Sequence, residues 1–278
     1  MKKTGLILLL IFLAAGAFML LAPTPVLEAE AMGTLISVRG EHGREAVAEV
    51  KRLERLLSSF DPSSEVSRIN ALAGIAPVKV SGKTLQIVLR SIDYSRLSGG
   101  AFDITLGRKG SFRDIVVDKS KKTVFLKNHG MKIDLGGIGK GFAIESARQL
   151  LVAKGVKKAL INMRSSITAI GGPWRIGISD PTSESRALGV VVLNNGEALS
   201  TSGQYEQPGH ILDPRTGRKA DQCLSVTIIC RDAGAADALS TAVFVLGPEK
   251  GMALLRRLNA GGIIVAKSGK MVRNTELL

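Results

Sequence analysis

The first stretch whose residues could do chemistry is the glycine-rich one at residues 133–145, where we expect a short apolar strand to break into glycines and resume as a helix. Glycine has no side chain, so such a turn lets backbone approach a ligand closely. The first amides of a helix are unpaired donors, and they suit an anion. Glycines at this kind of turn also serve packing alone, so an anion site and a purely structural turn remain equal alternatives.

Two common phosphate-binding fingerprints do not fit this stretch. Lys140 is followed by Gly141, where a P-loop needs serine or threonine. Phe142 stands where the dinucleotide-binding fingerprint needs its third glycine. Any anion bound here must therefore be held by another arrangement.

Two further stretches carry reactive side chains. His210 lies in a polar run at residues 199–217, which we expect to form loops, and an imidazole with a near-neutral pKa suits a general base. Asp237 and Thr241 are four positions apart in a predicted helix, so both side chains leave one helical face. Taken alone, Asp237 would be interpreted as a first-turn carboxylate favoured by the helix dipole.

The cysteines and histidines do not suggest a disulfide or a zinc site. Cys223 and Cys230 flank a predicted strand at an odd offset, which puts their side chains on opposite faces. The chain has three histidines and no cysteine pair at zinc-binding spacing. We therefore expect neither feature.

The composition is that of a globular protein with a basic surface. The chain has 278 residues, of which 45% are apolar, enough to fill a core. The 4% aromatic content argues against stacking on nucleic-acid bases, and the net charge of +14 is spread along the chain. Nucleic acid is therefore not an expected partner.

The N-terminus carries a targeting signal or an anchor. An apolar run at residues 6–22 follows Lys2 and Lys3 and ends before Pro23. This run is at the short limit for a membrane span and longer than a usual signal core, so we favour an uncleaved anchor over a cleaved signal. Residues 1–27 would form this segment. Residues 28–278 would form a domain at the cell inner membrane, facing the periplasm or another extracytoplasmic side.

Helical and strand patterns alternate irregularly after the anchor, which predicts one mixed α+β domain. Ser81 is a suitable N-cap for one of the helices. The expected helices cover residues 44–60, with Phe60 on the buried stripe, then 65–70, 81–98, 140–154, 233–246 and 248–258. The expected strands cover residues 32–38, 115–117, 123–126, 159–163, 174–181, 189–193, 224–229 and 262–266.

Seven short stretches, taken together in this order, resemble the FAD:protein FMN transferase (ApbE) family, and the resemblance covers nearly the whole chain after the anchor. They are residues 32–34, 64–70, 101–105, 133–145, 200–203, 210–217 and 236–242. The resemblance implies a single mixed α/β domain of the ApbE type, T-fold-like, after an N-terminal hydrophobic helix. It also implies transfer of FMN from FAD to a threonine of an acceptor protein with the help of Mg²⁺, releasing AMP. Typical acceptors are flavoprotein subunits of membrane redox systems.

The resemblance assigns roles to individual positions. It puts Mg²⁺ on the Asp237 carboxylate, the Thr241 hydroxyl and the Gly139 carbonyl, which are the hard oxygen ligands that this ion prefers. It makes His210 the base that deprotonates the acceptor threonine. The residues expected to bind the flavin cofactor are Met32, Ser67, Asn70, Gly136, Gly137, Lys140, Thr201, Ser202 and Gly203.

Two departures from the family pattern keep other functions open. Residues 108–112 replace a longer segment, which shortens one wall of the usual site, and Arg164-Ser165-Ser166 replaces glycine-glycine-asparagine. The alternatives are a non-catalytic flavin-binding relative and an FAD pyrophosphatase that gives FMN and AMP.

Overall fold

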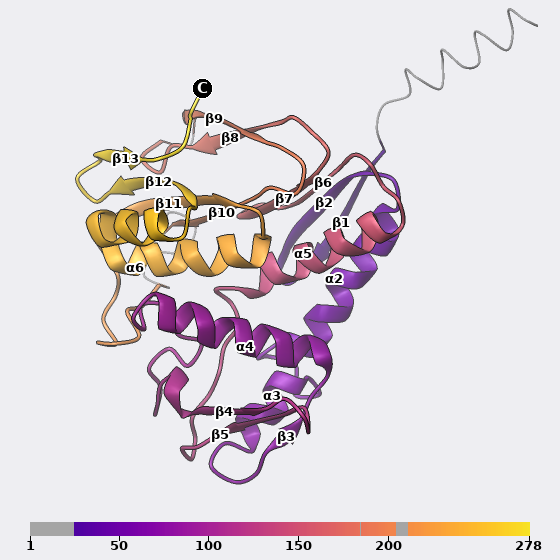
Figure 1. The fold of residues 1–278 in the computed structure, drawn as a ribbon, viewed down its shortest axis with the longest axis vertical. Helices are drawn as coiled ribbons and strands as arrows, with labels where there is room; N and C mark the ends of the chain where they lie inside the picture. The colour runs from indigo at the N-terminus through magenta and orange to yellow at the C-terminus, as the bar shows by residue number, and fades with distance from the viewer. Residues whose placement is uncertain (1–24, 184, 204–210) are drawn as a thin grey trace, which may run out of the picture.

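The computed structural model describes residues 25–183, 185–203 and 211–278. Within these ranges, eight antiparallel strands form the main sheet in the order β1-β2-β6-β7-β10-β11-β12-β13 (Figure 1). The strands are β1 (Val26–Ala31), β2 (Thr34–Gly40), β6 (Ala159–Met163), β7 (Ser166–Ile170), β10 (Ala198–Gly203), β11 (Cys223–Cys230), β12 (Gly261–Ala266) and β13 (Met271–Arg273). The chain therefore forms the mixed domain that its patterns predict.

Helices cover one face of this sheet. They are α2 (Gly43–Leu57), α5 (Gly139–Ala153) and α6 (Ala233–Arg257), and each contacts sheet strands (Figure 1). The opposite face packs against the hairpin of β8 (Trp174–Ser179) and β9 (Ala187–Leu193), where Ile178 and Val191 share a buried cluster with Ile167 of β7. The sheet is thus buried on both sides, which explains the fully buried β7.

A smaller layer lies beyond α4 (Gly82–Leu97). It contains α3 (Glu65–Ala71), the 3₁₀ turn η1 (Phe112–Asp114) and a three-stranded sheet of β3 (Val78–Lys79), β5 (Thr123–Leu126) and β4 (Ile115–Asp118). The Ser81 side chain accepts the Thr84 N–H, so the predicted cap of α4 is confirmed. The predicted hairpin at residues 115–126 is confirmed as well.

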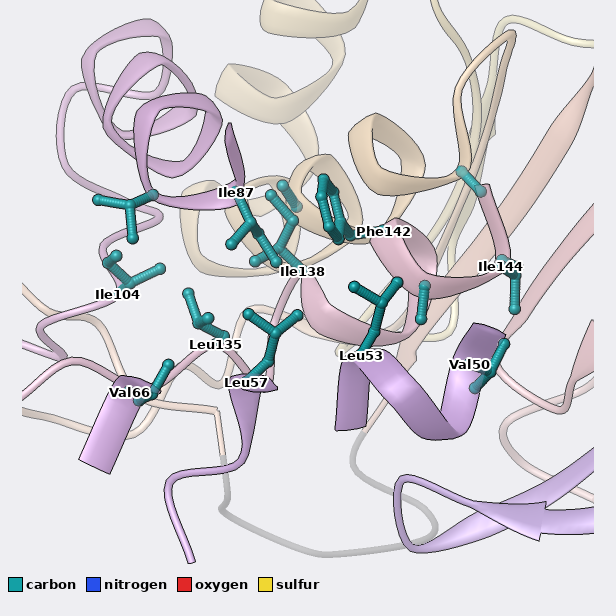
Figure 2. Close-up of a cluster of buried hydrophobic side chains, with 14 of the residues drawn as sticks. Val50, Leu53, Leu57, Val66, Ile87, Ile104, Leu135, Ile138, Phe142 and Ile144 are labelled. Atoms are coloured by element: carbon teal, nitrogen blue, oxygen red, sulfur yellow. The ribbon is translucent and has the colours of Figure 1, made fainter. Parts of the chain in front are cut away.

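One hydrophobic cluster joins the two layers and holds the glycine-rich segment in place. Figure 2 shows Leu53 of α2 and Ile87 of α4 near Leu135 and Ile138, the two apolar residues that flank the first glycines. Ile138 is fully buried and Leu135 is 4% exposed. Burying a side chain of this size stabilises a fold by about 1.5–3 kcal/mol, so the segment is anchored on both sides of its glycines.

Five strands of the structure are absent from the expected set. Residues 26–31 form β1, which pairs with β2 through a turn at Met32 and Gly33. Both turn residues have positive φ, 52° and 70°, as a two-residue type I′ hairpin requires. Residues 198–203, taken as loop because they are polar, form β10, whose hydroxyls are bonded inside the fold. β7, β13 and the two-residue β3 also have no counterpart among the expected strands.

The stretch before the glycines is irregular and is not a strand. Its backbone is satisfied by other groups: the Asn70 amide bonds both the N–H and the carbonyl of Ile133, and the Asp134 N–H donates to the Ile104 carbonyl. A side chain thus replaces the sheet partner that the apolar pattern suggested.

α6 contains both predicted C-terminal helices, separated by a kink at Gly247, where φ is 79°. It is the one helix of the described ranges that is long and apolar enough to cross a membrane, but 67% of its apolar window is buried in the domain, as in a core helix. The predicted anchor at residues 6–22 lies outside the described residues. The predicted boundary at 27/28 falls within β1, so Val26 and Leu27 belong to the sheet.

Candidate functional site

The glycine-rich turn packs directly against one turn of α6. The Gly141 N–H donates to Asp237 Oδ2 at 2.9 Å. A β-carbon on Gly137 would lie 3.3 Å from Thr241 Oγ1, and one on Gly141 would lie 2.1 Å from the Ala233 carbonyl oxygen. The structure therefore brings together two stretches that are about a hundred residues apart in sequence, and the approach needs a glycine at position 141.

Asp237 is a buried carboxylate with defined partners. It is 5% exposed, and the Ser200 hydroxyl of β10 donates to its Oδ1 at 3.2 Å. Burial raises the pKa of Asp237, while the nearby Lys140 ammonium and the hydrogen bonds from Gly141 and Ser200 oppose that rise. A cation bound beside Asp237 would stabilise its ionised form, because the positive charge offsets the cost of burying the carboxylate.

Thr241 lies one helical turn from Asp237 and meets a second hydroxyl of β10. Its Oγ1 is 3.4 Å from Ser202 Oγ, and Ser202 also bonds Ser240 Oγ at 2.8 Å. Ser200 and Ser202 share the helix face of β10 because strand side chains alternate. The side chain of Thr201 points to the other face, where it bonds Thr227 Oγ1 at 2.9 Å. Of the predicted cofactor contacts in β10, only Ser202 places a side chain beside Asp237 and Thr241.

Gly139 is the first residue of α5 and lies between these two contacts. Gly139 is buried, but no atom outside its own helix and chain neighbours lies within 4 Å of a β-carbon built on it, so there is room beside its Cα. A carbonyl oxygen has two lone pairs, so that of Gly139 can keep a helical hydrogen bond and still face a ligand.

The next predicted residues upstream line a cavity of about 480 Å³. Ser67 and Asn70 of α3 lie in its wall beside Ile133 and Asp134. Asp134 Oδ1 accepts the Gly136 N–H at 2.7 Å. One continuous segment therefore runs from the cavity to Asp237, and it places Ser67, Asn70, Gly136, Gly137, Gly139 and Lys140 along one path.

Met32 lies away from this path, in the turn between β1 and β2. Its N–H donates to Glu54 Oε1 of α2 at 2.7 Å, and its side chain packs against the main core. It does not line the cavity. The structure thus gives Met32 a clear part in holding the hairpin to α2.

Phe60 was placed wrongly from its spacing. It continues the apolar stripe of the predicted helix 44–60, but α2 ends at Leu57 and Phe60 is 92% exposed at the cavity. Ser58 Oγ accepts the N–H groups of Phe60 and Asp61 and so turns the chain out of the helix. The Asp61-Pro62 pair was the sequence signal for an earlier helix end.

Arg108 and Lys132 also line the cavity and were not among the predicted site residues. They give it a positive charge. The sequence carried no signal for them, because basic residues are common along the whole chain.

The shortened segment after Thr105 forms one wall of the cavity and is closed by Asp103. The two carboxylate oxygens of Asp103 accept the N–H groups of Thr105 and Phe112 at 2.9 and 2.8 Å. Asp103 is 5% exposed, and burial raises its pKa. These contacts make Asp103 the carboxylate that closes this turn.

His210 lies outside the described residues, but the segment that follows it is described. Residues 211–217 pack against the cavity wall: a β-carbon on Gly107 would lie 2.2 Å from the Pro214 carbonyl oxygen. In this segment Arg215 makes two hydrogen bonds of 2.8 Å to the Asp213 carboxylate, which lower the pKa of Asp213. The Arg215 guanidinium is therefore held by Asp213, two residues away in its own segment.

The donor set fits a hard cation. In residues 25–183, 185–203 and 211–278, no three His, Cys, Asp or Glu side chains form a metal-binding group. Asp237 and Thr241, with the Gly139 carbonyl, offer oxygen atoms of the kind that Mg²⁺ takes when water and phosphate complete its shell. Cys223 and Cys230 are unpaired thiols, and burial raises the pKa of Cys223 to about 12, so neither suits metal binding at neutral pH.

Comparison with known proteins gives matches that span the domain. A family model described as the ApbE family matches residues 32–112 and 108–264. The FAD:protein FMN transferase of Klebsiella pneumoniae (strain 342) is 34% identical over 258 residues, covering 80% of this chain and 81% of its own. That of Treponema pallidum (strain Nichols) is 30% identical over 305 residues, covering 87% and 84%. The crystal structure of the ApbE protein of Thermotoga maritima superposes with a TM-score of 0.82 at 29% identity, covering 90% of this chain and 96% of that one.

Proposed function

Because the chain belongs to the ApbE family, we propose that it is an FAD:protein FMN transferase, which moves FMN from FAD to a threonine of an acceptor protein and releases AMP. Two relatives that are 34% and 30% identical to it carry this name. The observation that carries the proposal is the bond between the Gly141 N–H and Asp237, which joins α6 to the glycine-rich segment whose first residues, Ile133 and Asp134, line the cavity.

The metal would be held by the Asp237 carboxylate, the Thr241 hydroxyl and the Gly139 carbonyl. When bound there, Mg²⁺ supplies positive charge that stabilises the negative charge developing on a pyrophosphate. Lys140 acts in the same direction, since its ammonium is close enough to Asp237 to oppose the rise in pKa of that carboxyl.

The cavity would hold the flavin. Its volume of about 480 Å³ lies in the range of pockets that take small cofactors. The exposed ring of Phe60 offers a flat apolar surface for a fused ring system, and Ser67 offers a hydroxyl. Asn70 fixes the cavity wall through its two bonds to Ile133. Arg108 and Lys132 attract the anionic ligand.

The transfer step needs a base, and we assign it to His210. The threonine oxygen forms a bond to the phosphorus of the FMN half while the bond from that phosphorus to the bridging pyrophosphate oxygen breaks. The bonding electrons leave with AMP, and His210 takes the threonine proton. The packing of residues 211–217 against the cavity wall supports this placement.

The setting of the reaction is proposed from the N-terminal sequence. Residues 6–22 would anchor the chain in the inner membrane with the domain on the extracytoplasmic side. Acceptors would then be flavoprotein subunits of membrane redox systems that share this side.

The test uses the full chain with FAD, MgCl₂ and an acceptor domain. We expect the acceptor to gain the mass of one FMN while AMP appears in equal amount. AMP without a mass gain would instead identify an FAD pyrophosphatase. If neither the mass gain nor AMP is observed, the chain is a flavin-binding protein without catalysis, and the proposal is contradicted.

Two variants separate the roles within the site. Asp237→Ala should abolish Mg²⁺-dependent turnover, because the one carboxylate of the metal site is gone. His210→Ala should reduce transfer far more than FAD binding, measured by flavin fluorescence. Thr227→Val is the matched control: it removes a buried hydroxyl on the far face of the sheet and should leave turnover unchanged.

A further inference from the structure

A row of hydroxyl groups lies behind Asp237 on the side of the sheet. Ser166 of β7 and Ser200 of β10 are directly opposite in the antiparallel register, and both are completely buried. Their Oγ atoms are 3.1 Å apart, and Ser200 Oγ is 3.2 Å from Asp237 Oδ1. None of the predicted site residues belongs to this row except Asp237 itself.

The chemistry of the groups fixes the direction of these bonds. An ionised carboxylate only accepts hydrogen bonds, so the Ser200 proton is donated to Asp237. Ser200 has one proton, so it acts as the acceptor toward Ser166. The row is therefore a relay in which Ser166 donates to Ser200 and Ser200 donates to the carboxylate.

The relay holds one oxygen of Asp237 while the backbone holds the other. Oδ1 accepts from Ser200, and Oδ2 accepts from the Gly141 N–H. With a donor on each oxygen, rotation of the carboxylate would break at least one buried hydrogen bond. The carboxylate plane is thus set by β10 and α5 before any cation arrives.

We propose that Ser200, supported by Ser166, is a positioning residue that orients the Asp237 carboxylate for Mg²⁺. This inference rests on the metal site of the proposed function. It also gives the Arg164-Ser165-Ser166 stretch a function in the site, because the Ser166 hydroxyl is the first donor of the relay. Groups that hydrogen-bond a metal ligand typically change metal affinity by about 10–100-fold when they are removed.

The same strand offers a matched control. Thr168 lies two residues beyond Ser166, so it shares the face of β7, and it is also completely buried. Within the described part of the chain its hydroxyl has no hydrogen-bond partner. Thr168→Val therefore removes a buried hydroxyl from the same face without breaking the relay.

The experiment titrates the full chain with MgCl₂ alone by calorimetry, with thermal unfolding of the metal-free protein recorded in parallel. We expect Ser200→Ala to weaken Mg²⁺ binding by about 10–100-fold. Ser166→Ala should weaken it less, because Ser200 can still donate to Asp237. Ser200→Thr keeps the hydroxyl and should restore most of the affinity, and Thr168→Val should bind as the wild type does.

The outcomes separate this inference from the function on which it rests. Wild-type Mg²⁺ binding that Asp237→Ala abolishes and Ser200→Ala leaves unchanged overturns the relay and keeps the proposed metal site. An equal loss in Ser200→Ala and Thr168→Val also overturns it, since general loosening of the sheet would then be the cause. A wild-type chain that binds no Mg²⁺ overturns the proposed metal site and the relay together.

Discussion

At Gly141 the backbone of α5 lies in close contact with α6. A β-carbon there would lie 2.1 Å from the carbonyl oxygen of Ala233 and 2.6 Å from the β-carbon of Asp237, and the first of these atoms belongs to helix backbone that cannot rotate away. We expect Gly141→Ala to lower the free energy of unfolding by at least about 1–3 kcal/mol, the usual range for overpacking. Urea denaturation measures the change.

Gly139, two residues earlier, supplies the control for that substitution. No atom lies within 4 Å of its would-be β-carbon, and it lies at the start of the same helix. Gly139→Ala should therefore leave stability unchanged or raise it by about 0.5–1 kcal/mol through the better helix propensity of alanine. Equal destabilisation by both substitutions would show that close packing is not the reason for Gly141.

Asp103 should make stability depend on pH in the acid range. Its native pKa is raised by burial above the ordinary value of 3.8, so between these two pKa values the unfolded state ionises while the native state keeps its proton. The free energy of unfolding contributed by Asp103 therefore falls as pH rises through that window. It is constant below the window and again above it.

Asp103→Asn removes the titration. It also replaces one of the two acceptor oxygens with an NH₂ group, but the cost of that lost hydrogen bond does not depend on pH, so the pH dependence of the difference isolates the titration. We expect the stability of the wild type relative to this variant to fall as pH rises from about 3 and to level off above the raised pKa. Urea denaturation across a pH series measures the difference. A relative stability that rises with pH would contradict the raised pKa.

Individual residues were predictable where local spacing decides their place. The four-residue spacing of Asp237 and Thr241 was enough to put them on one face of α6. Ser166 and Ser200 were not found as partners of Asp237, because their contact depends on the register between β7 and β10, 34 residues apart. Sequence spacing contains no information about such a register.

At the scale of elements, the turn between β6 and β7 has a left-handed residue that is not glycine. Met163 pairs with Ser166, so Arg164 and Ser165 form the two-residue turn, and Arg164 has φ of 57°. This conformation is unfavourable for a residue with a β-carbon by about 1–2 kcal/mol. We expect Arg164→Gly to raise the free energy of unfolding by roughly 1 kcal/mol.

The same substitution tests whether the Arg164-Ser165-Ser166 stretch impairs the site. The Arg164 side chain is exposed, while Ser166 keeps the relay to Asp237. FMN transfer by Arg164→Gly should therefore match that of the wild type. A large gain in transfer would show that the arginine obstructs catalysis.

The elements were predicted best where one face is buried and the other exposed. α2 carries Val47, Val50, Leu53 and Leu57 at helical spacing, and all four are buried. β10 was missed because its residues are mostly polar. Its hydroxyls are bonded within the fold, so a strand of serine and threonine is buried without an apolar pattern.

At the scale of the whole molecule, the net charge of +14 opposes compaction. Raising NaCl from about 10 to about 150 mM shortens the screening length from about 30 to about 8 Å, which weakens this repulsion. We expect the midpoint of thermal unfolding to rise over this range. An unchanged or lower midpoint would mean that local ion pairs outweigh the overall repulsion.

The order of the main sheet also determines when the protein can assemble during synthesis. β2 ends at Gly40, but its partner β6 begins at Ala159. The N-terminal hairpin therefore cannot pair with β6 until about 120 further residues have been synthesised. At about 5–20 residues per second, this wait is roughly 6–24 s. The glycine-rich turn likewise cannot form its hydrogen bond to Asp237 until that part of α6 has been synthesised. During that interval the free edge of β2 is open to wrong partners, which makes the nascent chain a natural client for chaperones.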